Sequence, residues 1–166
     1  MLLWDGRPAH ATNLWKLFNS HSLVSLEITA TNPCTAMTHL IEYEDANDEV
    51  RAVYDDIRAT RKTEYINNFW KAIASHPPTL QRTWQNVKEV MAGPGELDPL
   101  TRELIYIAVS VTNGCQYCIS SHTAAGRAKG MDDAIFGELM AIVATANATN
   151  RLANGYQIPV DEQFKL

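Results

Sequence analysis

The sequence predicts an all-α protein, and three observations lead to this conclusion. From Asn47 onward, apolar residues recur at spacings of three and four, as they do on one face of a helix. No stretch alternates apolar and polar residues for long enough to form a strand. Residues that cap or end helices (Asp, Asn, Gly and Pro) fall between the periodic segments. The 166 residues, 46% hydrophobic and 20% charged, are enough for one domain with a hydrophobic core.

The first half of this pattern predicts three helices. The first is capped by Asn47 or Asp48 and ends in the basic stretch ATRKT, where positive charge suits a helix C-terminus. The second covers about Ile66–Ser75 and is interrupted by HPP, because a residue before proline disfavours the α conformation. The third stops at Gly93-Pro94-Gly95. The residues expected in the core are Val50, Val53, Tyr54, Ile57, Phe69, Trp70, Ile73, Leu80, Trp84, Val87 and Met91.

The second half predicts three more helices. Asp98 caps a helix whose run Leu104–Val111 is apolar on nearly all sides, so we expect this helix to be central and buried. The next helix starts with the cysteines and is closed by Gly130. The last runs from about Asp132 to Asn147, with Asp132 and Asp133 as its expected caps, and is followed by an irregular polar tail. Its expected core residues are Ile135, Leu139, Ile142 and Val143.

Residues 1–36 differ from the rest, with scattered Trp, Leu and Phe and no sustained periodicity. A natural start follows at Met37, so we expect residues 37–166 to form a single domain. Residues 1–36 are then an upstream extension of the true coding start or a poorly ordered tail. The alternative is an ordered arm that packs on a neighbouring molecule.

Charge and cysteine content narrow the class of function. The net charge of -5 gives no general attraction to phosphate backbones, so we expect no nucleic acid partner. The apolar run Leu104–Val109 is too short to cross a bilayer, and we expect no membrane partner. Three cysteines, one of them remote at Cys34, do not make a secreted disulfide framework. Paired cysteines in such a chain indicate redox or metal chemistry in a reducing compartment, which predicts a cytoplasmic location.

Cys115, Cys118 and His122 form the first candidate site. At about 100° per helical residue, Cys118 lies about 60° from Cys115, and His122 within about 40° of each. The three side chains therefore share one stripe, where His122 can reach Cys118 and the two sulfurs can form a disulfide. Near a helix start the backbone amides favour a thiolate, and a histidine can accept its proton. These properties are those of a redox-active dithiol.

Glu103 stands twelve residues before Cys115 in an otherwise apolar helix. The break at Asn113-Gly114 lets the two helices fold back as a hairpin, which brings Glu103 towards the cysteines. A carboxylate on a solvated face is the simpler interpretation of a single glutamate. The apolar surroundings disfavour that interpretation, because a buried carboxylate needs a partner.

A structural zinc site is an alternative use of the same residues, which are all of types that zinc accepts. Structural zinc usually takes a second close ligand pair from a loop, whereas three of these ligands lie on one helical stripe. We therefore expect no bound metal. The four residues are Glu103, Cys115, Cys118 and His122.

The pattern E-x11-C-x2-C-x3-H resembles the catalytic signature of the alkylhydroperoxidase D (AhpD) family, within the carboxymuconolactone decarboxylase-like superfamily. The segments NNFWKAIASHPPTLQRTW and GELDPLTRELI are similar to the peroxidase-related branch of that superfamily. The resemblance covers about Ile66–Met140. It implies an all-α, AhpD-like domain with the CxxC motif at the N-terminus of a core helix that follows a buried helix. It also implies trimers or hexamers and the reduction of hydroperoxides.

The resulting hypothesis is a thiol peroxidase that serves antioxidant defence. Cys118 attacks the peroxide and becomes a sulfenic acid, and Cys115 condenses with it to a disulfide. The opposite assignment, with Cys115 as the attacking residue, stays open, because a cysteine nearer the helix start can have the lower pKa. His122 is the general base, and Glu103 orients it or passes its proton on. A thiol or a lipoyl or thioredoxin-like protein restores the dithiol, and no cofactor is expected.

One residue departs from the family pattern. Tyr117 stands where the best-known AhpD proteins have a second histidine, and a tyrosine, with a pKa of about 10, shuttles protons less readily. Any relay must then run through Glu103, His122 and water. Two alternatives remain, namely lactone decarboxylation, which needs no dithiol, and a non-catalytic helical assembly module. Because so much helix surface is apolar in a small domain, we also expect the core to be completed at a subunit interface.

Overall fold

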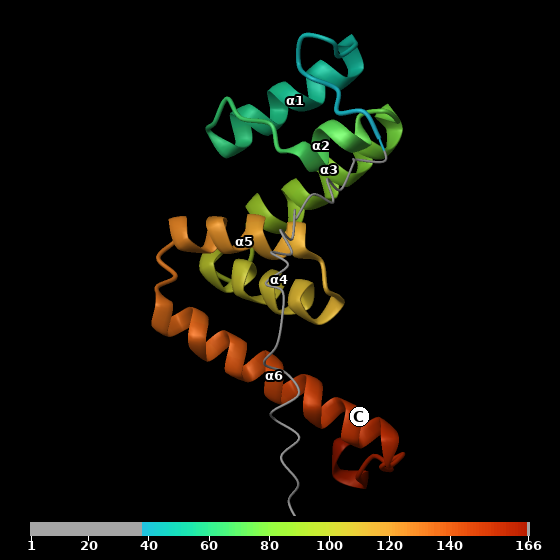
Figure 1. Cartoon of the computed structure of the whole chain (residues 1–166), viewed down its shortest axis with the longest axis vertical. Helices are drawn as coiled ribbons and strands as arrows, with labels where there is room; N and C mark the ends of the chain where they lie inside the picture. Colours follow the sequence, from blue (N-terminus) through green and yellow to red (C-terminus); the bar gives the residue numbers. More distant parts are fainter. Residues whose placement is uncertain (1–37, 166) are drawn as a thin grey trace, which may run out of the picture. The chain divides into compact units, whose positions relative to one another are not determined.

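A computed structural model describes residues 38–165 of the chain (Figure 1). These residues form α-helices and one short 3-10 helix, with no strand among them, so the predicted all-α class is confirmed. The expectations for residues 1–36 lie outside the described residues. The helices are α1 (Asp48–Arg61), α2 (Asn68–Ile73), α3 (Pro77–Ala92), α4 (Pro99–Asn113), α5 (Gln116–Ala128) and α6 (Asp133–Gly155), followed by η2 (Glu162–Phe164).

Three of the side chains that the sequence predicts to be helix N-caps have this role in the structure. Asn47 caps α1, Asp98 caps α4 and Asp132 caps α6, and each accepts a hydrogen bond from a backbone amide of the first turn. Such a cap is worth about 1 kcal/mol, because it satisfies an amide that has no partner inside the helix. The caps therefore define where three of the helices begin.

Helices α1, α2 and α3 enclose the main hydrophobic cluster of the described residues. Tyr54 and Ile57 of α1 and Leu80 of α3 are fully buried there. The rings of Trp70 and Trp84 meet edge to face, with centroids 5.4 Å apart, a preferred aromatic geometry. Both tryptophans are therefore core residues, as predicted.

Helices α4 and α5 form the predicted hairpin. Gly114 ends α4 in the left-handed conformation with φ 69°, and its N–H donates to carbonyls of the last turn. Glycine adopts this conformation without the steric cost that a Cβ would bring. The chain then reverses at once, and Cys115 becomes the N-cap of α5. The cysteine helix therefore packs directly against the helix that carries Glu103.

The helix that was expected to be central and buried, α4, is buried on one face and exposed on another within the described residues. Its buried residues are Glu103, Ile107 and Ser110, whereas Ile105 and Val109 are 49% and 53% exposed. The reason is that the neighbours of α4 within the described residues, α3, α5 and α6, leave this side of it uncovered. An apolar strip on α4 therefore faces outward.

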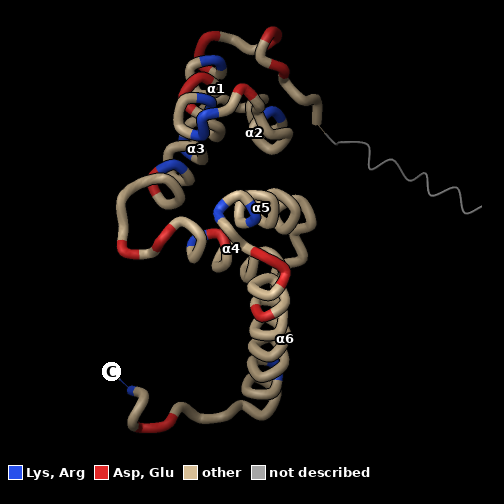
Figure 2. The backbone as a smooth tube through the Cα atoms, turned by 90° about the vertical axis from the view of Figure 1, so that its left-hand side faces the viewer, with Lys and Arg blue, Asp and Glu red and all other residues tan. Residues whose placement is uncertain are grey.

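Helix α6 is longer than predicted, because it continues past Asn147 to Gly155. The segment after Asn147 is rich in Asn and Thr, which favours a tail, but it contains no proline and its alanines and Leu152 sustain the helix. Val143 is buried as expected, whereas Ile142 is 58% exposed, because α6 packs on α4 with one face only. Figure 2 shows that few charged residues lie along α6. No described helix has both the length and the hydropathy to cross a membrane.

Candidate active site

Cys115 and Cys118 are joined by a disulfide at the start of α5, with Cα atoms 5.4 Å apart. Cys115 is the N-cap of the helix, and its sulfur accepts a hydrogen bond from the backbone N–H of Cys118 at 3.3 Å. After reduction, that amide and the positive end of the helix dipole would favour a thiolate here. The backbone at the start of α5 therefore allows the two cysteines to form a disulfide and favours the thiolate form after reduction.

Glu103 is buried between α4 and α5, with only 5% of its surface exposed. One carboxylate oxygen accepts a hydrogen bond from Nδ1 of His122 at 2.7 Å, and the other accepts one from Nζ of Lys129 at 2.9 Å. Burial of an ionised carboxylate is costly unless such partners are present. The structure thus brings Glu103 to His122, as the hairpin prediction required, and adds Lys129 as a second partner.

These contacts determine the charge of Glu103. Burial alone raises the pKa of this carboxyl, but the hydrogen bonds from His122 and Lys129 and the charge of Lys129 outweigh that effect. The pKa of Glu103 is therefore lower than that of an ordinary glutamate. The group is a carboxylate at neutral pH.

His122 is held in one orientation by two contacts. Its ring stacks on Tyr106, with centroids 3.6 Å apart and planes 17° apart. Because Glu103 is ionised, it accepts the proton of Nδ1, so the neutral imidazole has its lone pair on Nε2. In this tautomer, Nε2 has the free lone pair with which a general base accepts a proton.

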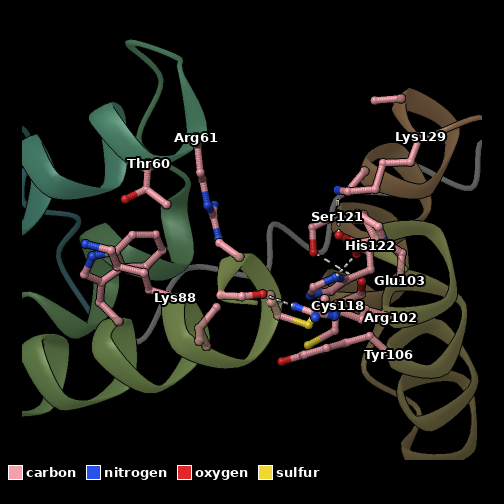
Figure 3. A pocket seen from close by; sticks show the side chains of 18 of the residues that line it. Thr60, Arg61, Lys88, Arg102, Glu103, Tyr106, Cys118, Ser121, His122 and Lys129 are labelled. Carbon is pink, nitrogen blue, oxygen red and sulfur yellow. Dashed lines mark hydrogen bonds and ion pairs between the residues drawn. The ribbon is translucent and has the colours of Figure 1, made fainter. Parts of the chain in front are cut away.

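A cavity of about 990 Å³ lies beside these residues (Figure 3). Cys118, Ser121 and His122 of α5 line it together with Glu103, whereas Cys115 is not among its lining residues. Trp84 of α3 lines the cavity as well, so the space runs from the main core to the disulfide. Of the two sulfurs, Cys118 is the one that a molecule in this cavity would meet.

Tyr117, between the two cysteines, has a structural contact. Its hydroxyl oxygen accepts a hydrogen bond from the backbone N–H of Phe69 at 3.1 Å, and the two rings lie 6.4 Å apart. Because Phe69 belongs to α2, this bond ties the start of the cysteine helix to the α1–α3 core. No such contact could be expected from local sequence, since the two residues are far apart in the chain.

The zinc alternative finds no ligand set between residues 38 and 165. No three His, Cys, Asp or Glu side chains in this range are placed to hold a metal ion. The two sulfurs are bonded to each other, and both oxygens of Glu103 are occupied by His122 and Lys129. The four candidate ligands are therefore arranged as a disulfide next to a carboxylate–histidine pair.

The family model of the carboxymuconolactone decarboxylase family matches residues 78–161, which is just over half of the chain. The chain belongs to this family. The matched range begins in α3 and includes Glu103, both cysteines and His122.

Two further proteins are similar to this member of the carboxymuconolactone decarboxylase family. The crystal structure of an alkylhydroperoxidase AhpD core from Rhodospirillum rubrum is 51% identical, with a TM-score of 0.72, and the match covers 78% of this chain and 97% of that one. An uncharacterized protein from Haemophilus influenzae is 33% identical over 60 residues, which are 36% of this chain and 53% of that protein. The chain thus spans about half the length of that curated relative. The resemblance stated from the motif is confirmed, because both sequence and fold are AhpD-like.

Three further residues line the cavity of this carboxymuconolactone decarboxylase family protein. Lys129 lies two helical turns after His122, and this spacing could have predicted that the two side chains share one face of α5. Tyr106 lies one turn after Glu103, yet its stacking on His122 depends on how α4 and α5 pack. Arg61 reaches the cavity from α1, and no local spacing relates it to the cysteines.

Proposed function

We propose that this protein is a thiol-dependent hydroperoxide reductase that cycles Cys115 and Cys118 between dithiol and disulfide. One observation carries the proposal: Cys118, which is bonded to Cys115 at the start of α5, lines the same cavity as the hydrogen-bonded pair of Glu103 and His122. Such a neighbourhood suits a thiolate that attacks and then closes to a disulfide. The likeness to an alkylhydroperoxidase AhpD core gives independent support.

In the proposed cycle, the thiolate of Cys118 attacks the terminal oxygen of R–O–OH. The O–O bond breaks, the sulfur becomes a sulfenic acid, and the alkoxide takes a proton to leave as R–OH. The thiol of Cys115 then attacks that sulfur, so that a disulfide forms and water leaves. We assign the attack to Cys118 because it lines the cavity, whereas Cys115 does not.

The neighbouring residues manage the protons in this cycle. His122 accepts the thiol proton at Nε2, and the resulting imidazolium can protonate the leaving alkoxide. Glu103 is a positioning residue, because it holds the tautomer of His122 and stabilises the imidazolium. Lys129 keeps Glu103 ionised and in place. This relay does not require a second histidine, and Tyr117 takes no part in it.

A dithiol reductant must reopen the disulfide after each turnover. A small dithiol, or a lipoyl or thioredoxin-like protein, supplies two electrons and two protons and is itself oxidised to a disulfide. No bound cofactor is needed for any of these steps. We place the cycle in antioxidant defence in a reducing compartment, where such reductants are present.

The proposal is tested with purified wild-type protein, a dithiol and an organic hydroperoxide. We expect one equivalent of hydroperoxide to remove two free thiols per chain, and excess dithiol to sustain turnover. Loss of hydroperoxide that leaves the thiol count unchanged would contradict the cycle. Lactone decarboxylation, the alternative, would instead persist after both cysteines are alkylated, since that chemistry needs no dithiol.

The protein is also proposed to form a homo-oligomer through the outward faces of α4 and α6. The exposed residues Ile105 and Val109 of α4 and Ile142 of α6 would be covered in such an assembly. The low charge of α6 in Figure 2 fits the same role, because interface cores are depleted of charge.

A lysine on this surface is expected to weaken the assembly. Val109→Lys should shift the mass in light scattering towards that of one chain, because a charge would be buried without a partner. Val90→Lys is the matched control, since Val90 is 59% exposed on α3. A wild-type protein with the mass of a single chain would contradict the interface.

A further inference from the structure

Arg61, the last residue of α1, is solvent-exposed in part, lines the cavity and lies over the rings of two tryptophans. The centre of its guanidinium lies 5.5 Å from the ring centroid of Trp70 and 5.3 Å from that of Trp84. One of its terminal nitrogens donates to the side chain of Asn67 at 2.9 Å. Figure 3 shows this side chain extending from α1, across the pocket from Cys118 and His122.

Arg61 differs from the other cations that line the cavity. Lys88 is paired with Asp56, and Lys129 with Glu103. The guanidinium of Arg102 is engaged by backbone carbonyls, which are those of Val90, Gly93 and Leu97. Within residues 38–165, Arg61 has no carboxylate at ion-pair distance and uses its guanidinium in one hydrogen bond. A guanidinium offers five N–H donors in a planar fork, so most of its hydrogen-bonding capacity remains for a ligand.

A role at the helix end does not account for this placement. A cation in the last turn of a helix gains only about 0.3–1 kcal/mol from the dipole, and this gain does not require contact with two tryptophan rings. Here desolvation lowers the pKa of Arg61, whereas the nearby carboxylate of Glu103 raises it. The guanidinium is therefore partly desolvated and within electrostatic reach of the redox site. An anionic ligand would compensate that desolvation.

More of the cavity lining is apolar than polar. Its volume of about 990 Å³ is at the upper end for small-molecule sites, so it can hold an extended molecule. Its apolar lining includes Trp84, Val87, Met91, Leu97 and Ala125. A ligand that matches these surroundings has an apolar chain, an anionic group for Arg61 and a reactive group for Cys118.

We propose that Arg61 is the carboxylate-binding residue of this cavity and selects hydroperoxides that carry a carboxylate, with hydroperoxy fatty acids as the substrate class. The proposal deepens the proposed function and rests on it. In the reaction the peroxide is reduced to an alcohol, water is released and the dithiol becomes a disulfide. The carboxylate is unchanged, because it serves only to bind. Planar carboxylates suit the fork of an arginine, which can bind both oxygens at once.

The kinetic test compares a hydroperoxy fatty acid with its methyl ester. Arg61→Gln is expected to lower kcat/KM for the acid about ten- to hundredfold and to leave the ester within about twofold, because only the acid loses a charge-assisted hydrogen bond. Arg61→Lys should restore part of the preference through its charge. Arg82→Gln, an exposed arginine on α3, is the matched control and should change neither rate. An equal loss for acid and ester would overturn the proposal.

A binding measurement separates this proposal from the peroxidase proposal. The oxidised protein is titrated with the corresponding hydroxy fatty acid and with its methyl ester, and the change in tryptophan fluorescence reports binding, since Trp70 and Trp84 line the cavity. Tighter binding of the acid that is lost in Arg61→Gln supports the carboxylate site even if no hydroperoxide is consumed. Equal affinities for acid and ester, or an acid preference that survives in Arg61→Gln, overturn it even if the protein proves to be a peroxidase.

Discussion

Replacing Cys118 with serine is expected to reduce hydroperoxide-dependent oxidation of a dithiol to the uncatalysed background. A serine hydroxyl is not ionised near neutral pH and cannot accept oxygen from a peroxide as a thiolate does. The measurement is the loss of hydroperoxide with and without enzyme, together with the free thiol count. Undiminished turnover would refute the assignment of Cys118 as the attacking residue.

Cys115→Ser is the matched control on the same helix. It should also fail to turn over, but it should consume one equivalent of hydroperoxide in a single event. The product is a sulfenic acid on Cys118, which has no thiol partner and can be trapped by a sulfenic-acid reagent and located by mass spectrometry. If Cys118→Ser instead gives a trapped sulfenic acid on Cys115, the two roles are exchanged. Circular dichroism of both variants shows whether α5 has kept its helical structure.

Glu103→Gln is expected to lower kcat/KM by about 10²–10⁴-fold, the range of general acid–base contributions. Glutamine keeps the size of the side chain but cannot stabilise the imidazolium of His122, and it leaves Lys129 without its counter-charge. Breaking this partly buried ion pair should also lower the free energy of unfolding. The expected loss is only about 1–3 kcal/mol, because Lys129 can turn towards solvent when its partner is removed. The two effects are measured by steady-state kinetics and by denaturant unfolding. Glu138→Gln, exposed on α6, is the control and should change neither.

The stability effect of Glu103→Gln should depend on pH with a defined sign. The folded pKa of Glu103 lies below that of an ordinary glutamate, about 4.3 in the unfolded chain. Its contribution is therefore fully present above that value and is lost as the pH falls through the folded pKa. The free energies of unfolding of the wild type and Glu103→Gln should converge in acid. A difference that stays constant down to the acid limit would mean that the charge of Glu103 does not stabilise the fold.

Local sequence was sufficient for much of the helical framework. The caps Asn47, Asp98 and Asp132 lie at helix starts as predicted, because a side chain that satisfies an amide of the first turn acts within a few residues. The same is true of Gly114, whose positive φ ends α4 and creates the hairpin. The end of α6 was misplaced, since weak helix formers after Asn147 are outweighed by the uninterrupted backbone hydrogen bonding.

The sequence by itself determined the all-α class, the disulfide-forming pair Cys115 and Cys118, and the expectation that Glu103 needs a partner. Helical periodicity and spacing act over a few residues, so these features are readable from the chain. Only the tertiary structure decided that Lys129 shares Glu103 with His122, and that Arg61 of α1 reaches the same cavity as Cys118. It also decided that one side of α4 stays exposed in the single chain. These contacts join distant segments, and the packing of whole helices, not the order of residues along any one of them, sets their geometry.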